Sequence, residues 1–125
     1  MYRLLVVDDE VIIADGLQEV FQSLDTVQLD VYKAYSGDDA LKILNKVRMD
    51  IVLTDIRMPG IDGIQLMKEI QKRWPKCRII FLTGYDEFEY VYTAIQHEGV
   101  NYILKTEGYS KIINVVEGVI SEIEQ

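Results

Sequence analysis

Polar residues of complementary chemistry follow four apolar runs of this sequence, at the point where each run ends. They are Asp8, Asp9, Asp55, Thr83 and Lys105. Three carboxylates held close together repel one another, and a bound divalent cation removes that penalty. Oxygen ligands without histidine or cysteine select a hard ion, Mg²⁺ or Mn²⁺, over zinc. A carboxylate nucleophile, a hard metal, an ammonium group and a hydroxyl donor together predict a phosphoryl-transfer site.

Each of these residues also has an ordinary structural interpretation when it is taken alone. An aspartate at a strand end often caps the next helix, a lone lysine is usually solvated, and a lone threonine usually belongs to a turn. Four of five strand ends carry complementary groups, however, and that combination is much rarer than its parts. The combination therefore favours a functional site.

The elements that must position these residues are short strands alternating with helices. Runs that are apolar throughout predict buried parallel strands at 3–7, 51–54 and 78–82. The segment 29–34 alternates like a more exposed strand, and a fifth strand is predicted at 101–104. Because strand 29–34 ends without an acidic residue, we expect it at the edge of the sheet, away from the site.

Apolar residues at helical spacing predict a helix after each strand. Three of the predicted helices cover 11–24, 88–98 and 110–122. A further helix is capped by Ser36 and continues through Leu44, and another runs from Ile64 to the break at Trp74–Pro75. Five β-α units predict an α/β fold: a flavodoxin-like, doubly wound parallel sheet of order 2-1-3-4-5 with helices on both faces. The crevice outside the carboxyl ends of the strands then collects the polar residues.

Length and composition set the class of protein. A chain of 125 residues, 49% hydrophobic and 27% charged, corresponds to one globular domain. Its net charge of −8 disfavours direct binding to nucleic acid. No apolar run reaches the length of a membrane span, so no membrane partner is expected. The single cysteine, Cys77, excludes an intramolecular disulfide framework and fits a reducing, cytoplasmic compartment.

Four motifs resemble those of the receiver domain of two-component response regulators, and the likeness covers essentially the whole chain. An acidic pair lies within 6–10, a threonine within 82–84, and an aromatic residue and lysine within 102–105. The most specific stretch is 55–63, which is similar to the signature D-x-x-M-P-x-x-D/N-G. The resemblance implies a CheY-like fold and a single receiver domain over 1–125, with no effector domain in this chain.

The resemblance also implies roles for the site residues. Asp55 would be the phosphoacceptor, receiving a phosphoryl group from a sensor histidine kinase. Asp8, Asp9, Asp55 and the backbone carbonyl of Arg57 would hold the Mg²⁺ (or Mn²⁺). The only enzymatic content implied is phosphorylation of the domain itself and later autodephosphorylation.

Three further residues would read out the phosphoryl group. Thr83 and Lys105 would bind its oxygens, and Tyr102 would be the switch aromatic that turns into the space vacated by Thr83. That movement would remodel the face formed by 88–98, 101–104 and 110–122, through which such domains form homodimers. The segment 83–91 also resembles a subset of receivers fused to AraC-type DNA-binding domains. The implied output is transcription, with DNA bound only through such a fused effector.

Three positions beside the motifs carry two further expectations. Thr106 stands where most receivers have a proline after the strand lysine, and we expect a trans Lys105–Thr106 peptide bond because a cis bond before a non-proline residue costs about 2.5–4 kcal/mol. Because the loop that begins at Thr106 lacks the usual proline, the resemblance alone does not fix the direction in which the Lys105 side chain points. Arg57 and Tyr85 border the site, and the hypothesis is that this large pair slows autodephosphorylation; the alternative is that both point into solvent.

Three other functions stay open at this point. A pseudo-receiver that only binds proteins would need no phosphorylation, although the complete acid set argues against it. A flavin-binding module would share the fold, but the acidic segment 8–10 would repel the flavin phosphate. A Mg²⁺-dependent phosphohydrolase usually has a second acid two residues after the nucleophile, where this sequence has Arg57.

Overall fold

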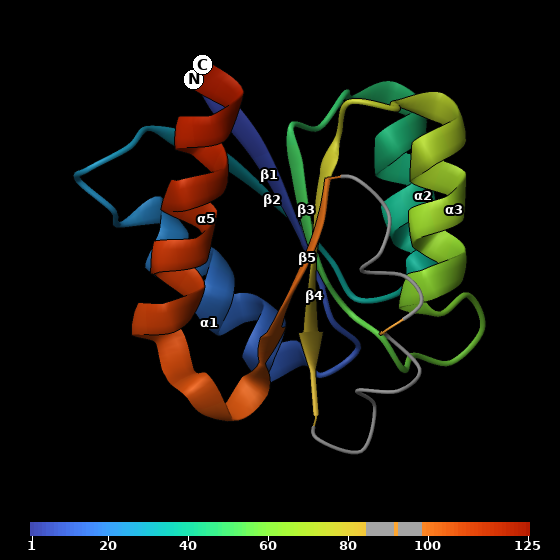
Figure 1. Cartoon of the computed structure of the whole chain (residues 1–125). Helices are drawn as coiled ribbons and strands as arrows, with labels where there is room; N and C mark the ends of the chain where they lie inside the picture. The colour runs from blue at the N-terminus through green and yellow to red at the C-terminus, as the bar shows by residue number, and fades with distance from the viewer. Residues whose placement is uncertain (85–91, 93–98) are drawn as a thin grey trace.

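The fold is a five-stranded parallel sheet between two layers of helices (Figure 1). The structure, a computed structural model, describes residues 1–84, 92 and 99–125. The strands are β1 (Tyr2–Val7), β2 (Leu29–Ala34), β3 (Ile51–Asp55), β4 (Arg78–Thr83) and β5 (Val100–Leu104). Their order is β2-β1-β3-β4-β5, and every adjacent pair is parallel. The predicted α/β architecture and strand order are confirmed, with β2 at an edge.

The helices lie on both faces of this sheet. They are α1 (Val11–Gln22), α2 (Gly37–Lys46), α3 (Gly63–Arg73) and α5 (Gly108–Glu124), and a 3-10 turn, η3 (Lys105–Glu107), precedes α5. Figure 1 shows α1 and α5 on one side and α2 and α3 on the other. The predicted helix at 88–98 lies, apart from Tyr92, outside the described residues.

Burial of the central strands on both faces explains why their sequences are apolar throughout. In β1, Leu5 and Val7 pack toward one core with residues of α2 and α3, whereas Leu4 and Val6 pack toward a second core with residues of α1 and α5. All four side chains are at most 1% exposed. Since neighbouring side chains of a strand point to opposite faces, a strand covered on both sides shows no polar alternation.

Local hydrogen bonds set where α2 and α3 begin. The Ser36 hydroxyl accepts from the Asp39 backbone N–H at 3.0 Å, as expected of the predicted cap. Asp62 and Gln65 form a capping box, each side chain accepting from the other residue's backbone N–H, at 2.8 and 3.0 Å. This second cap is not among the predicted features, and it fixes the end of the loop that follows β3.

The element boundaries differ from the predictions by a few residues. Helix α1 ends at Gln22 rather than Leu24, and α5 begins at Gly108 rather than Ser110 because η3 leads directly into it. Strand β1 begins and helix α5 ends at the same pole of the molecule, where Figure 1 places both termini. Among the described residues, no helix combines the length and the apolar character needed to cross a membrane.

Candidate functional site

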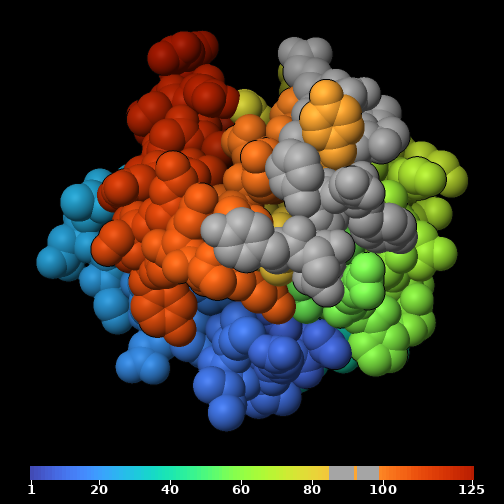
Figure 2. Space-filling model, turned by 60° about the horizontal axis from the view of Figure 1, so that its bottom comes forward, coloured from blue at the N-terminus to red at the C-terminus, as the bar shows by residue number. Residues whose placement is uncertain are grey.

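The strand order brings the predicted site residues together at the carboxyl ends of the strands. Asp55 and Thr83 are the last residues of β3 and β4, Asp8 directly follows β1, and Lys105 directly follows β5. The pairing register aligns these strand ends, since Asp55 lies opposite Leu82 and Thr83 lies opposite Leu104. Figure 2 turns this end of the molecule toward the viewer, where the segments after β1 (blue), β3 (green) and β5 (orange) surround it.

Three carboxylates form the centre of the site. Asp8, Asp9 and Asp55 each offer one oxygen, and these oxygens all lie within 4.8 Å of one another. Asp8 and Asp55 are buried, with 1% and 5% of their surface exposed, whereas Asp9 is exposed. One oxygen of Asp8 accepts the Glu10 backbone N–H at 2.9 Å, and Oδ1 of Asp55 accepts the Ile56 N–H at 2.9 Å.

Lys105 supplies a positive charge to the site. Its Nζ lies 3.2 Å from Oδ1 of Asp55 and 3.9 Å from Oδ2 of Asp8. Burial by itself lowers the pKa of Lys105, but the carboxylates of Asp55 and Asp8 outweigh burial and hold that pKa above its ordinary value. Lys105 is therefore a cation, and it bridges the two buried acids.

One lysine does not neutralise the acidic cluster. Burial raises the pKa of Asp8 to about 6; the Glu10 N–H bond opposes that rise and the nearby Asp55 charge adds to it. Oδ2 of Asp8 is buried and accepts no hydrogen bond from any described residue. An orphaned carboxylate oxygen within an all-oxygen donor set fits a hard divalent cation such as Mg²⁺. The residues present therefore fit the predicted metal.

Thr83 and Tyr102 lie on the same side of the sheet. Phe81 and Val100 belong to the core on the α2 and α3 side, and strand alternation places Thr83 and Tyr102 on that side with them. Tyr102 lies opposite Phe81, so it is a diagonal neighbour of Thr83 across the β4–β5 pair. The Thr83 hydroxyl is buried and donates to the Gly84 carbonyl at 3.1 Å, whereas Tyr102 is 38% exposed.

Two glycines, which sequence reasoning did not identify as site residues, hold the loop after β3 against Asp55. The Gly63 N–H donates to the Ile56 carbonyl at 2.7 Å, and a Cβ on Gly63 would lie 2.4 Å from the Asp55 carbonyl oxygen. A Cβ on Gly37 would lie 2.6 Å from the carbonyl oxygen of Ile61, in the same loop. The sequence signals for these contacts are the position of each glycine at the first turn of a helix and, for Gly63, the final glycine of the signature over 55–63.

The two expectations beside the motifs have different outcomes. No peptide bond among the described residues is cis, so the Lys105–Thr106 bond is trans as predicted, and Lys105 nevertheless reaches Asp55. Arg57 is exposed, which fits either interpretation of that residue. Tyr85 lies outside the described residues, so the effect of the pair on autodephosphorylation stays a prediction.

Comparisons with known proteins agree with this geometry. The family model for the response regulator receiver domain matches residues 4–117. The uncharacterized transcriptional regulatory protein YesN of Bacillus subtilis is 34% identical over 125 residues, which are 100% of this chain and 34% of YesN. The Staphylococcus regulators that also match share 44–46% of their length with the chain, so it spans less than half of these curated relatives.

Two solved structures superpose closely on the chain. A two-component transcriptional regulator AraC from Clostridium phytofermentans has a TM-score of 0.87 at 32% identity, with 100% of this chain and 96% of that chain covered. The response regulator protein TrrA from Thermotoga maritima, solved in complex with Mg²⁺-BeF, has a TM-score of 0.81 at 31% identity, with coverage of 95% and 99%.

Proposed function

The chain belongs to the response regulator receiver domain family, and from that premise we propose that it is a Mg²⁺-dependent phosphoacceptor switch with Asp55 as the acceptor. The observation that carries the proposal is the position of Asp55. Its carboxylate is buried, lies within reach of Lys105 and shares a cluster with two further acids. A signalling module of this kind acts on itself rather than turning over a separate substrate.

The transfer step is a nucleophilic displacement at phosphorus. A carboxylate oxygen of Asp55 attacks the phosphoryl group of a phosphohistidine on a sensor kinase, a P–O bond forms as the P–N bond breaks, and the leaving imidazole nitrogen takes a proton from solvent. Autodephosphorylation reverses the outcome: water attacks the phosphorus, the acyl phosphate P–O bond breaks, and inorganic phosphate leaves the free carboxylate. Both steps concentrate negative charge beside Lys105.

Each residue of the site has a proposed part. Asp8 and Asp9, with Asp55 and the backbone carbonyl of Arg57, would hold the Mg²⁺, which when bound offsets negative charge on the phosphoryl oxygens. Lys105 orients Asp55 before transfer and pairs with the phosphoryl group afterwards. Tested against the structure, the metal assignment is supported by the orphaned oxygen of Asp8, and TrrA, a similar protein, was solved with Mg²⁺-BeF.

Signal output is proposed to begin at Thr83. Its hydroxyl would leave the Gly84 carbonyl to bind a phosphoryl oxygen, and Tyr102, its diagonal neighbour on β5, would turn toward the vacated space. Such a movement changes the surface of β5, which would favour a homodimer through the face of β5, α5 and 88–98. Similarity to an AraC-type regulator and to YesN supports a transcriptional output through an AraC-type domain.

Intact mass after incubation with acetyl phosphate and Mg²⁺ tests the proposal. The wild type is expected to gain one phosphoryl group, and Asp55→Asn is expected to gain none because the amide is not a nucleophile. Asp38→Asn, which removes a carboxylate outside the cluster, serves as the matched control and should be phosphorylated like the wild type. An unmodified wild-type protein that still binds Mg²⁺ would instead indicate a pseudo-receiver or a strict need for the cognate kinase.

A further inference from the structure

The cationic side chains of this acidic chain are concentrated in one segment. Nine of its 13 lysines and arginines lie between residues 42 and 78, which contain only four of its 21 acidic residues. Helices α2 and α3 end, with their last basic residues, at the pole where the strands begin (Figure 1). This pole is opposite the Asp55 site, and the acidic residues Asp50 and Glu122 also lie there.

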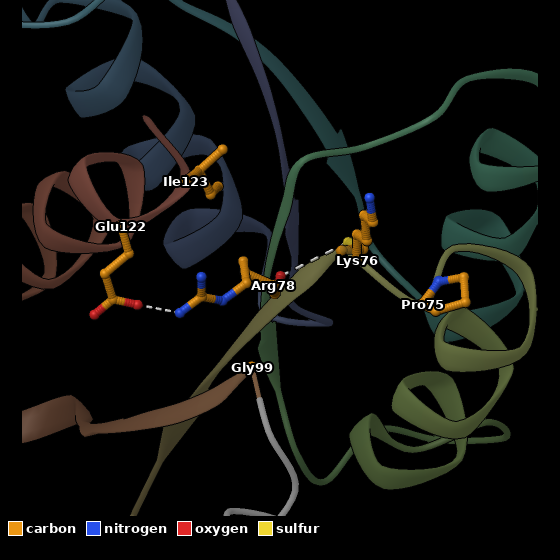
Figure 3. Close-up of a pocket in the computed structure, with 7 residues that line it drawn as sticks. Pro75, Lys76, Arg78, Gly99, Glu122 and Ile123 are labelled. Carbon is orange, nitrogen blue, oxygen red and sulfur yellow. Dashed lines mark hydrogen bonds and ion pairs between the residues drawn. The ribbon is translucent and has the colours of Figure 1, made fainter. Parts of the chain in front are cut away.

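Two hollows open at this pole, and both are lined by the turn at Pro75–Cys77. The larger, of about 640 Å³, is drawn in Figure 3 and includes Arg78, whose guanidinium reaches Glu122 of α5. The smaller, of about 290 Å³, is lined by Arg48, Trp74, Pro75, Lys76 and Cys77, and is called the Trp74 hollow below. Its volume is enough for one or two side chains, not for a folded element.

The walls of the Trp74 hollow are apolar and held in place. The Trp74 indole N–H donates to the Leu44 carbonyl at 3.3 Å, so the polar atom of the ring is satisfied and the ring surface is left for contact. Cys77 is buried beside it, and burial raises the pKa of its thiol to about 12, which keeps the sulfur neutral. Trp74 itself is only half-buried, so part of this surface meets solvent.

Two cations flank this apolar surface, and the carboxylate of Asp50 also lies close enough to act on the Cys77 thiol. Arg48 and Lys76 are exposed, and neither takes part in an ion pair with another described residue. Lys46 and Arg73 lie in the last turns of α2 and α3, where a cation stabilises the helix dipole. Arg48 and Lys76 lie outside both helices, so that explanation does not account for them.

We propose that the Trp74 hollow is a docking site for an acidic peptide segment of a partner protein, one that inserts an apolar anchor between Arg48 and Lys76. An apolar side chain would gain contact with Trp74, Pro75 and Cys77, and flanking carboxylates would pair with the two cations. The apolar lining of the hollow, which accepts a hydrophobic side chain, favours a peptide over a nucleic acid as the occupant. A peptide bound in the Trp74 hollow would leave the Asp55 site, at the other end of the strands, accessible to solvent.

Trp74 provides a direct readout because it is the only tryptophan of the chain. The probe is a blocked peptide, Asp-Glu-Asp-Leu-Leu-Asp-Glu-Asp, titrated into the full chain while Trp74 emission is recorded. We expect a saturable change with a Kd of about 100 μM, weakened by added salt. The variant Arg48→Ala, Lys76→Ala should weaken binding by about tenfold. The control is the double variant Lys68→Ala, Lys111→Ala. It removes the same charge at two exposed positions outside the hollow, and it should bind the peptide like the wild type.

Four outcomes would overturn the proposal. They are no saturable change up to about 2 mM peptide, equal binding by the Arg48→Ala, Lys76→Ala variant, equal binding of a peptide with serine in place of both leucines, and tighter binding of a DNA duplex than of the acidic peptide. A thermal melt of each variant confirms that it is folded before titration. Loss of phosphorylation at Asp55 would not affect any of these measurements, so this proposal and the proposed function fail separately.

Discussion

Gly63 lies so close to Asp55 that a Cβ at position 63 would come within 2.4 Å of the Asp55 carbonyl oxygen and 2.9 Å of the Ile56 Cα. Both contacts are to backbone, which cannot rotate out of the way as a flexible side chain can. The hydrogen bond from Gly63 N–H to the Ile56 carbonyl holds the same approach. The start of α3 therefore sets the position of the proposed phosphoacceptor, through main-chain contact.

Gly63→Ala should destabilise the fold for this reason. Forcing an extra methyl group against backbone costs about 1–3 kcal/mol, and urea unfolding would measure the loss. Gly118 is the matched control, because it lies in α5 with nothing within 4 Å of its would-be Cβ. Gly118→Ala should stabilise by about 0.5–1 kcal/mol through helix propensity. Equal effects at the two positions would contradict the packing argument.

The buried acid Asp8 makes metal-free stability depend on pH. Because burial raises its pKa from 3.8 to about 6, the folded state holds a proton in that range that the unfolded state has released. The free energy of unfolding should therefore fall as pH rises from 3.8 to about 6, by up to about 3 kcal/mol, and stay lower above that window. Denaturant unfolding in chelator at a series of pH values measures this slope.

Asp8→Asn isolates the contribution of that carboxylate. It should flatten the pH dependence and raise metal-free stability at pH 7 by about 1–3 kcal/mol, because the amide carries no buried charge. Mg²⁺ is expected to stabilise the wild type at pH 7, and the same change should remove most of that stabilisation. A pH profile unchanged by Asp8→Asn would show that another group titrates in this window.

Lys105→Met should slow phosphorylation while leaving the apolar stem of the side chain in place. Lys105 is the cation that contacts Asp55, at 3.2 Å, and removing a positioned donor of this kind costs about 10²–10³ in rate. The rate of adduct formation from acetyl phosphate, followed by intact mass, measures the effect. Lys111→Met, at an exposed position of α5, should leave the rate unchanged.

The lifetime of the phosphorylated form tests the pair Arg57 and Tyr85. If these large side chains screen the phosphoryl group from water, Arg57→Ala, Tyr85→Ala should shorten the lifetime several-fold. Loss of the adduct with time, after removal of acetyl phosphate, gives the rate directly. A lifetime equal to that of the wild type would mean that both side chains point into solvent.

Most of the fold could be predicted because the relevant patterns are local. Strands covered on both faces are apolar throughout, and the predicted strands agree with the observed ones to within one residue at either end. Helix boundaries agree less well, as at Gly108, because η3 continues smoothly into α5 and no side-chain cap marks the junction. The alternation of strands and helices predicted the parallel sheet, and five units in a chain of this length suggested its flavodoxin-like order.

The meeting of Asp8, Asp55, Thr83 and Lys105 could be predicted from the sequence, because they stand at the carboxyl ends of parallel strands, which lie side by side. The differences between these residues depend on the three-dimensional packing. Asp8 is buried with an orphaned oxygen while its neighbour Asp9 is exposed, although the two are identical in type. Burial, charge spacing and the contact of Gly63 with Asp55 depend on atoms brought together from distant segments, and no local pattern encodes those distances.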